Sequence, residues 1–196
     1  MSKNIEIEAK AMITKEGYEA LLSAYKDLEN KVYTQENYYI DSSTFELNKL
    51  GLGLRIRRKS DGFIEFTVKE KQIEGKLEIN QAISIVEFDK FLENNVLPNG
   101  EVLNFVKAHY KGKIDELKRY ALLVTKRLDI EYKDGLISID ESLYNGIVDY
   151  EVECESTSME HAKELLEEFL NNKKIPFNWN HISKLKRARD SILKSR

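Results

Sequence analysis

Pairs of like charges recur in this chain at a spacing of two residues. Four such pairs are Glu6 with Glu8, Arg55 with Arg57, Lys69 with Lys71, and Glu151 with Glu153. Successive side chains of a β-strand point to opposite faces, so each pair would share one face of its strand. Like charges placed this way lie roughly 7 Å apart and gain nothing from each other. They are tolerable if a ligand or a metal ion compensates them, and the plainer alternative is a solvent-exposed polar face.

A polyanion bound together with a divalent cation would need this mixture of charges. Guanidinium and ammonium groups bind phosphate oxygens, and arginine favours bidentate contacts. Carboxylates are the oxygen ligands that Mg²⁺ prefers, and Mg²⁺ commonly shares its coordination with waters and substrate phosphates. The residue types therefore point to phosphate chemistry with a hard metal ion.

Strands must position these charges, because the residues between them are apolar. Leu54 and Ile56 alternate with Arg55 and Arg57, and the same alternation fits most other charged segments. We expect strands near 4–13, 31–41, 52–59, 62–71, 76–85, 116–132, 135–141 and 146–155. Apolar residues at helical spacing predict helices near 18–28, 88–92, 102–109 and 162–169, with a basic helix from about 183. A sheet closed into a barrel with its polar face inward would form a charged tunnel, whereas an open sheet would expose that face.

Composition sets wider limits on the protein. With 41% hydrophobic residues, the 196-residue chain can bury a substantial core, and we expect one domain over 1–196. A net charge of −3 does not favour nucleic-acid binding. Cys154 is the only cysteine, so no internal disulfide is possible, and its place on the apolar face of the segment EVECE predicts a buried structural thiol. We see no apolar run long enough for a membrane span and expect the protein in the cytoplasm.

The ordered set of charged motifs resembles the CYTH or triphosphate tunnel metalloenzyme superfamily. The matching elements are E-x-E-x-K (Glu6, Glu8 and Lys10), R-x-R (Arg55 and Arg57), Lys69 of FTVK, Arg127 of TKRLDI, Asp140 of ISID, E-x-E (Glu151 and Glu153), and Lys184 of HISKLKRA. The first motif alone is weak evidence. Seven elements in order over nearly the whole chain, with agreeing strand parity, are strong evidence.

The resemblance implies an α+β fold with an eight-stranded antiparallel β-barrel, open as a tunnel with a charged interior and helices outside. It also implies roles for individual residues. Catalytic roles fall to Glu6, Glu8, Lys10, Arg55 and Arg57. Triphosphate binding falls to Lys10, Arg55, Arg57, Lys69, Lys71, Arg127 and Lys184. Metal binding, to Mg²⁺ or Mn²⁺, falls to Glu6, Glu8, Asp140, Glu151 and Glu153.

Some assignments keep an alternative. Lys71 shares the face of Lys69 and competes with it as the main phosphate ligand, and Arg119 shares the parity of Arg127 if that strand is unbroken. Lys184 would instead be solvated if it joins Lys186, Arg187 and Arg189 on an exposed basic helix face. The three histidines, His109, His161 and His181, lack metal-ligand spacing and are interpreted as structural or exposed.

The leading functional hypothesis is a metal-dependent phosphohydrolase that acts on tripolyphosphate, thiamine triphosphate or a nucleoside triphosphate. A class IV adenylate cyclase, which converts ATP to cyclic AMP, is the first alternative. A non-catalytic polyphosphate- or nucleotide-binding module is the second, although binding alone would not need the acidic set. Neither nucleic acid nor membrane is an expected partner, and the sequence leaves the oligomeric state open.

Overall fold

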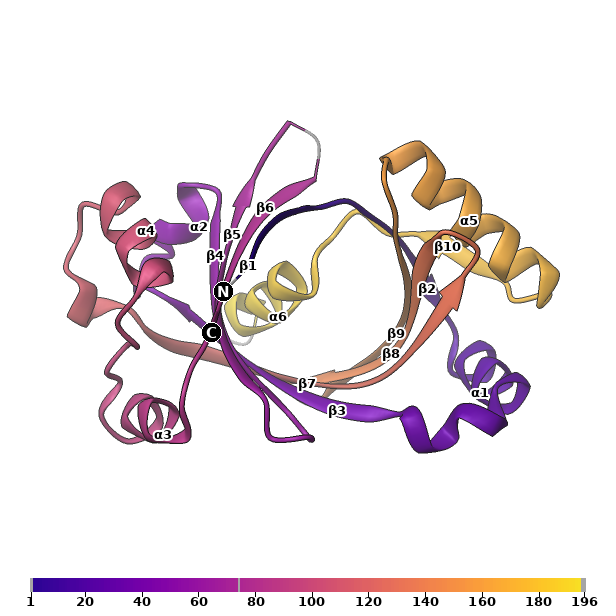
Figure 1. The fold of residues 1–196 in the computed structure, drawn as a ribbon, viewed down its shortest axis with the longest axis horizontal. Coiled ribbons are helices and arrows are strands. Elements are labelled where there is room, and N and C mark those ends of the chain that lie inside the picture. Colours follow the sequence, from indigo (N-terminus) through magenta and orange to yellow (C-terminus); the bar gives the residue numbers. More distant parts are fainter. Residues whose placement is uncertain (1, 74, 195–196) are drawn as a thin grey trace.

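A computed structural model describes residues 2–73 and 75–194 as a closed antiparallel sheet surrounded by helices (Figure 1). The strands are β1 (Ser2–Glu6), β2 (Glu8–Ile13), β3 (Tyr33–Asp41), β4 (Leu52–Lys59), β5 (Ile64–Lys71), β6 (Lys76–Ala82), β7 (Lys118–Tyr132), β8 (Gly135–Tyr144), β9 (Ile147–Glu155) and β10 (Phe177–Trp179). The α-helices are α1 (Lys15–Ala24), α2 (Glu46–Lys49), α3 (Ile85–Asn94), α4 (Glu101–His109), α5 (Met159–Asn172) and α6 (Lys184–Lys194). Two 3₁₀ helices span Lys26–Lys31 and Ile114–Glu116.

The N-terminal strand closes the barrel. The strand order is β1-β6-β5-β4-β3-β7-β8-β9-β2-β10, and only Ile7 separates β1 from β2. The first half of this segment pairs with β6 and the second half with β9, so one interrupted strand joins both ends of the sheet. Counting β1 and β2 as one strand gives the expected eight around the ring. The additional strand β10, which pairs with β2, was not predicted.

Apolar side chains point outward under the helices, in two separate clusters. One cluster lies between β3–β6 and helices α3 and α4, and includes Phe66, Phe88 and Val102. The other lies between β2, β7–β9 and helices α1 and α5, and includes Ile139 and Phe169. The polar face of the sheet therefore points inward, as the alternation predicted, and the open-sheet alternative is wrong.

Helix caps in the sequence begin the covering helices where the strands end. The hydroxyl of Thr14 accepts a hydrogen bond from the Gly17 amide at 3.1 Å at the start of α1. Ser84 and Glu87 form a capping box at the start of α3. Each cap satisfies backbone donors that the first helical turn leaves without a partner.

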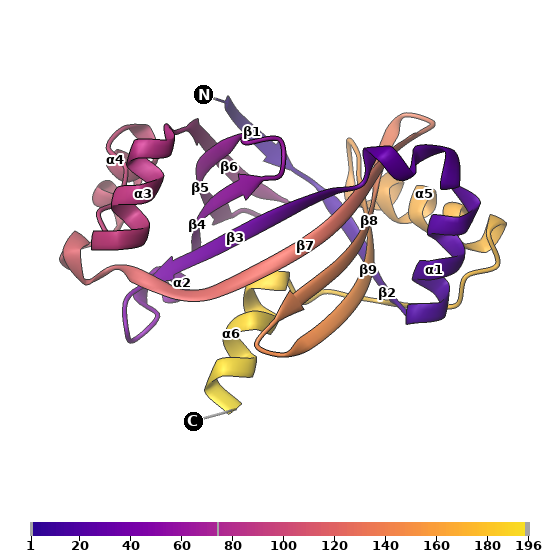
Figure 2. The same ribbon diagram turned by 90° about the horizontal axis from the view of Figure 1, so that it is seen from below.

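Helix α6 lies against one end of the barrel (Figure 2). Its Ala188 is fully buried against inward-facing residues of β3, β7 and β8, among them Tyr39, Leu123 and Tyr144. The helix therefore brings its basic residues to the end of the tunnel instead of forming an independent surface element.

A register shift in β7 corrects one sequence-based alternative. Tyr39 lies opposite Ala121, but Ile40 lies opposite Arg119, so the pairing skips a residue at this point. This bulge reverses the alternation of β7, and the Arg119 guanidinium lies 5.7 Å from the centre of the Tyr38 ring on the outer face. Arg119 is not part of the tunnel lining.

No helix in the described part of the chain is long and apolar enough to cross a membrane.

Candidate active site

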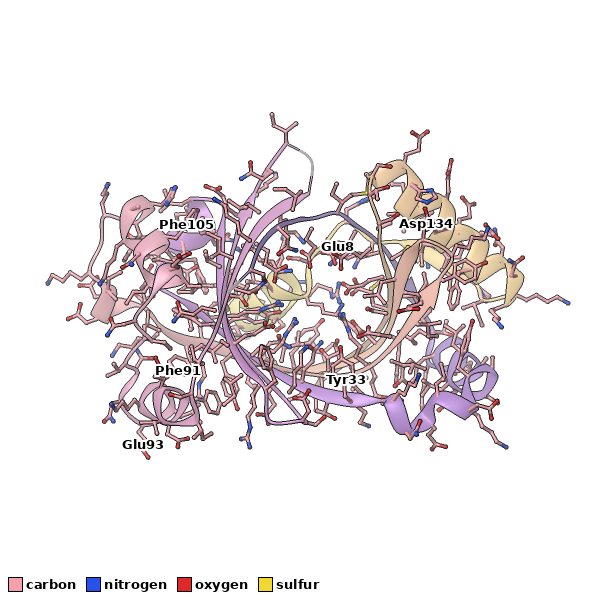
Figure 3. All side chains as sticks on the ribbon, viewed as in Figure 1. Glu8, Tyr33, Phe91, Glu93, Phe105 and Asp134 are labelled. Carbon is pink, nitrogen blue, oxygen red and sulfur yellow. The ribbon has the colours of Figure 1, made fainter. Side chains whose placement is uncertain are left out.

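The barrel encloses a charged cavity of about 610 Å³. Among the described residues, its basic lining consists of Lys10, Arg55, Arg57, Lys69, Lys71, Lys76, Arg127, Lys184, Lys186 and Arg189. Its acidic lining consists of Glu6, Glu8, Glu65, Glu78, Glu153 and Glu155. Cations outnumber carboxylates, so the cavity favours an anionic ligand. In Figure 3, Glu8 lies inside the ring of strands, while Phe91 and Phe105 lie among the outer helices.

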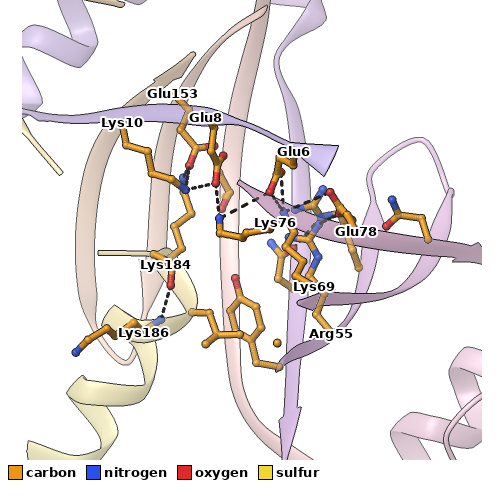
Figure 4. A pocket seen from close by; sticks show the side chains of 18 of the residues that line it. Glu6, Glu8, Lys10, Arg55, Lys69, Lys76, Glu78, Glu153, Lys184 and Lys186 are labelled. Atoms are coloured by element: carbon orange, nitrogen blue, oxygen red, sulfur yellow. Dashed lines mark hydrogen bonds and ion pairs between the residues drawn. The ribbon is translucent and has the colours of Figure 1, made fainter. Parts of the chain in front are cut away.

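Two groups of charged side chains face each other across this cavity (Figure 4). In the first, strands β4 and β5 present Arg55 and Lys69 beside Glu6 of β1 and Glu78 of β6. The Lys69 ammonium lies 2.6 Å from Glu6 and 3.5 Å from Glu78, and the Arg55 guanidinium lies 3.2 Å from Glu78. The Nε of Arg55 is buried without a hydrogen-bond partner in the described structure. That donor remains available for a ligand.

Arg57 lies on the same face of β4 as Arg55, and its closest carboxylate is farther away than that of Arg55. Its Nε donates to the Asn37 side-chain oxygen at 2.8 Å, and its nearest carboxylate, Glu65, is 3.5 Å away. Burial and the positive charges of Arg55 and Arg127 lower the pKa of Arg57 to about 10. A lowered pKa shows that its positive charge is disfavoured in the empty cavity, and an added anion would relieve this.

The second group surrounds Glu153 of β9 with three cations. The ammonium of Lys10 lies 2.8 Å from this carboxylate, that of Lys184 lies 2.7 Å away, and the Arg127 guanidinium lies 2.6 Å away. Burial opposes ionisation of Glu153, but these three charges outweigh burial and hold its pKa well below the usual range. Lys184 is thus inside the cavity, 11% exposed, and the solvated-surface alternative for it is wrong.

Two of the predicted metal ligands lie behind this group. Asp140 is fully buried and forms a bidentate pair with Arg127, with distances of 2.7 Å and 2.6 Å, and lies 2.8 Å from Lys184. Glu151 is 1% exposed and forms an ion pair with Arg187. Neither carboxylate lines the cavity. Both carboxylates form ion pairs with cations of the barrel or of α6, and their role as metal ligands stays a prediction.

The basic residues of α6 do not form one solvent-exposed face, so that alternative interpretation of the sequence is wrong. Arg187 is 13% exposed, and its Nε donates to Asp149 at 2.8 Å. Arg189, also 13% exposed, pairs with Asp190 and Asn48 and lies 5.9 Å from the Phe45 ring centre. Only Lys186 of the three remains half exposed. The helical spacing of these residues in the sequence did not reveal which of them faced the barrel.

Other lining residues also escaped sequence analysis. Lys76 lies 2.7 Å from Glu8. Glu78 pairs with Arg55 of β4 and with Lys69 of β5. Strand parity places Glu65 with Lys69, and Glu155 with Glu153, so the same alternation test identifies these two positions. Lys71 is exposed at the edge of the cavity, whereas Lys69 is buried between two carboxylates. Lys69 is therefore the better candidate for the main phosphate ligand.

The acidic residues are spread around the cavity. Among the described residues, no group of three or more acidic, histidine or cysteine side chains is placed to hold a metal ion by itself. The lining carboxylates nevertheless suit Mg²⁺ or Mn²⁺ chemically, since such ions are commonly held by one or two carboxylates together with substrate phosphates and water. The donor set fits a metal that arrives with a phosphorylated substrate.

Cys154 is buried, and His109 and His161 lie at the surface, as the sequence predicted. Cys154 is fully buried, and burial raises the pKa of its thiol to about 11, so it is a structural residue. His161 pairs with Asp134 on the surface, and His109 stacks on Phe105 at a centroid distance of 4.2 Å.

The fold is a closed antiparallel barrel with a charged interior that favours an anionic ligand. Comparisons with known proteins agree: the CYTH domain profile matches residues 4–187. The chain belongs to the CYTH domain family. It is 34% identical over 178 residues, 90% of each chain, to YjbK of Bacillus subtilis (strain 168), a candidate triphosphatase by name.

Two solved structures share the fold over almost their whole length. A candidate adenylate cyclase from Bacillus halodurans is 36% identical, with a TM-score of 0.86, covering 95% of this chain and 98% of that one. HpAC1 from Hippeastrum, a candidate adenylyl cyclase described as having a dominant triphosphatase activity, is 24% identical, with a TM-score of 0.79 and coverage of 95% and 96%.

Proposed function

We propose that this protein binds a triphosphate in the barrel and hydrolyses its terminal phosphoanhydride bond, with Mg²⁺ or Mn²⁺ as cofactor. Two observations on the neighbouring arginines carry the proposal. Arg55 has a buried Nε without a hydrogen-bond partner in the described structure, and Arg57 has its pKa lowered by burial and by neighbouring cations. A chain of phosphates would satisfy both, since phosphate oxygens accept hydrogen bonds and carry negative charge.

Residues from several strands would share the work of binding. Arg55, Arg57 and Lys69 would hold phosphoryl groups from one wall, and Lys10, Arg127 and Lys184 from the other. Binding at both walls stretches the phosphate chain across the cavity and orients the terminal phosphorus. Phosphoryl transfer depends mostly on such positioning and on neutralising charge, so these cations supply a large part of the catalysis.

The reaction would proceed by attack of water on the terminal phosphorus. The water oxygen forms the new P–O bond and releases one proton to solvent. The bridging P–O bond breaks, and its electron pair leaves with the rest of the substrate, which is inorganic diphosphate, thiamine diphosphate or a nucleoside diphosphate. Glu6, Glu8 and Glu153 are the predicted metal ligands that border the cavity. A divalent ion bound there would supply further neutralisation of the phosphate oxygens.

The relatives support two different reactions, hydrolysis and cyclisation, for a triphosphate bound in the same way. The B. subtilis relative is named for triphosphatase activity, and the B. halodurans structure for adenylate cyclase activity. Cyclisation of ATP requires the ribose 3′-hydroxyl to attack the α-phosphorus, so the nucleoside would have to enter the barrel as well. Tyr39 is the only aromatic residue among the described residues that line the cavity, which supports a phosphate chain over a stacked nucleobase.

A substrate screen tests the proposal. Tripolyphosphate, thiamine triphosphate and ATP would each be incubated with Mg²⁺ or Mn²⁺, measuring phosphate release from all three and cyclic AMP from ATP. We expect phosphate release from at least one triphosphate and none in excess chelator. Cyclic AMP without phosphate release would favour the cyclase. Tight binding without any turnover would favour a binding module, and activity that survives chelation would remove the metal from the mechanism.

A further inference from the structure

Gln35 of β3 is a buried carboxamide in the cavity wall that the protein itself does not use. Its side chain lines the cavity, and the residue is 2% exposed. Its Oε1 atom is buried without a hydrogen-bond partner in the described structure. Rotation of the carboxamide exchanges the positions of the oxygen and the NH₂ group, so either end can be offered to a ligand. Burying an unpaired polar group costs stability, so its presence needs a reason.

Three other carboxamides of the lining, Asn37, Asn48 and Asn80, have partners within the protein. Asn37 accepts from the Arg57 Nε at 2.8 Å, and its Nδ2 donates to the Leu123 carbonyl at 3.5 Å. Asn80 accepts from the Thr67 hydroxyl at 2.7 Å. These amides orient their neighbours, whereas Gln35 is left with both a donor and an acceptor to offer to something else.

The neighbours of Gln35 show what that partner would be. It lies opposite Lys59 of β4 and Thr125 of β7 in the register of the sheet. Arg57 and Arg127 are two residues away on these neighbouring strands and share its inward face, at a diagonal distance of roughly 7–8 Å between positions. The two guanidiniums lie near enough that the positive charge of Arg127 helps to lower the pKa of Arg57, after burial and Arg55. A phosphoryl group drawn between them would come within reach of the Gln35 amide.

We propose that Gln35 contacts the substrate, donating from its amide NH₂ to the phosphoryl group held between Arg57 and Arg127. Phosphoryl oxygens accept hydrogen bonds, so the NH₂ end suits them and a carboxylate would not. A neutral donor also adds a contact without a third positive charge beside two guanidiniums. This inference rests on the proposed binding of a triphosphate and assigns one further residue to it.

An isosteric substitution separates a substrate contact from a structural role. Gln35→Met keeps the length of the side chain and removes both polar ends. Binding of inorganic tripolyphosphate would be measured by calorimetry without metal, and melting temperature without ligand. Gln72→Met is the matched control, because Gln72 lies outside the cavity lining and its side-chain amide donates to Glu70 at 2.7 Å.

We expect Gln35→Met to weaken tripolyphosphate binding about 10-fold or more, as the loss of a hydrogen bond to a charged group predicts. The empty variant should melt no lower than the parent, because an unpaired buried polar group has been removed. The control should bind as the parent does. Binding within twofold of the parent would overturn the inference, and so would a large fall in the melting temperature, which would show that the amide stabilises the empty fold.

A second variant keeps the test decisive if methionine packs poorly. Gln35→Glu retains size and polarity but presents a carboxylate, and we expect it to bind tripolyphosphate more weakly than Gln35→Met does. A Glu variant that binds as tightly as the parent would contradict a donated hydrogen bond. A parent protein that binds no tripolyphosphate would instead refute the proposed function itself, which this comparison distinguishes from a failure at Gln35 alone.

Discussion

Arg127 and Asp140 form a bidentate ion pair inside the barrel, with the guanidinium of β7 bonded to both oxygens of a fully buried carboxylate on β8. The two residues lie directly opposite each other in the antiparallel register. Lys184 of α6 lies 2.8 Å from the same carboxylate. Asp140 thereby fixes two of the cations that we assign to the substrate, although it does not itself border the cavity.

Removing the charge of Asp140 should therefore damage both stability and activity. Asp140→Asn leaves Arg127 and Lys184 with less compensation in a buried position, and breaking a buried ion pair typically costs about 3–5 kcal/mol. Chemical denaturation measures the free energy of unfolding. The control is Glu141→Gln on the outward face of the same strand, where the carboxylate is 27% exposed and pairs with an exposed lysine. Equal, small losses in both variants would contradict the assigned role.

Arg57 should matter far more to catalysis than its neighbour Arg58. Arg57 lines the cavity, while Arg58 is exposed on the other face of the same strand, 5.8 Å from the Phe88 ring centre. Arg57→Ala is expected to lower kcat/KM for the triphosphate about 100-fold or more, because a buried guanidinium–phosphate contact is lost. Arg58→Ala should stay within about twofold. Similar effects at the two positions would argue against phosphate binding by Arg57.

The empty protein should not lose stability when Arg57 is removed. Its pKa of about 10 means that its charge is disfavoured in the cavity, mainly through burial and repulsion from Arg55 and Arg127. In melting experiments, Arg57→Ala should therefore match or exceed the parent without ligand. Tripolyphosphate should stabilise the parent by about 2.7 kcal/mol at a hundredfold excess over Kd, and the variant by clearly less at the same concentration. Sulfate at equal charge, which cannot span the cations, should have a smaller effect on the parent.

Arg187 is expected to affect activity without touching the substrate. It lies outside the cavity lining and pairs with Glu151, whose carboxylate is also 3.6 Å from Lys184. In Arg187→Ala this buried carboxylate would draw Lys184 toward itself and weaken the phosphate contact. We expect KM to rise about 10-fold and Arg187→Lys to recover part of the loss. The exposed Lys194 of the same helix, which lies outside the cavity lining, provides the control, and an equal effect of Lys194→Ala would contradict this positioning role.

Acid should destabilise the empty protein. The pKa values of Glu8, Glu78, Asp140 and Glu153 are lowered in the folded state, because neighbouring cations outweigh burial. These groups bind more protons in the unfolded chain, so their contribution is present above the unfolded pKa of about 4 and is lost as the pH falls.

Two carboxyls, Asp41 and Glu155, have pKa values raised chiefly by burial and oppose this trend. The four lowered groups should nevertheless decide the direction of the change. We expect the melting temperature to fall progressively below about pH 5. A melting temperature that stays constant down to pH 3 would show that the buried ion pairs do not contribute to stability.

The sequence alone determined which side chains share one face of each strand wherever the pairing has no bulge. Strict alternation places Glu6, Glu8 and Lys10 on one face, and Arg55 and Arg57 on one face, whatever the strands pair with, because successive side chains always point to opposite sides. The same rule applied at Glu65 and Glu155 identifies them as lining residues. The order of the motifs was also enough to identify the family.

Only the tertiary structure decided which of these charges contact one another. The bulge that turns Arg119 outward depends on pairing between β3 and β7, which are far apart in the sequence. The burial of Lys184, Arg187 and Arg189 depends on where α6 docks, since helical spacing defines faces but not what covers them. Whether a carboxylate binds a metal ion or holds a neighbouring cation depends on distances across the barrel, and local sequence does not encode these distances.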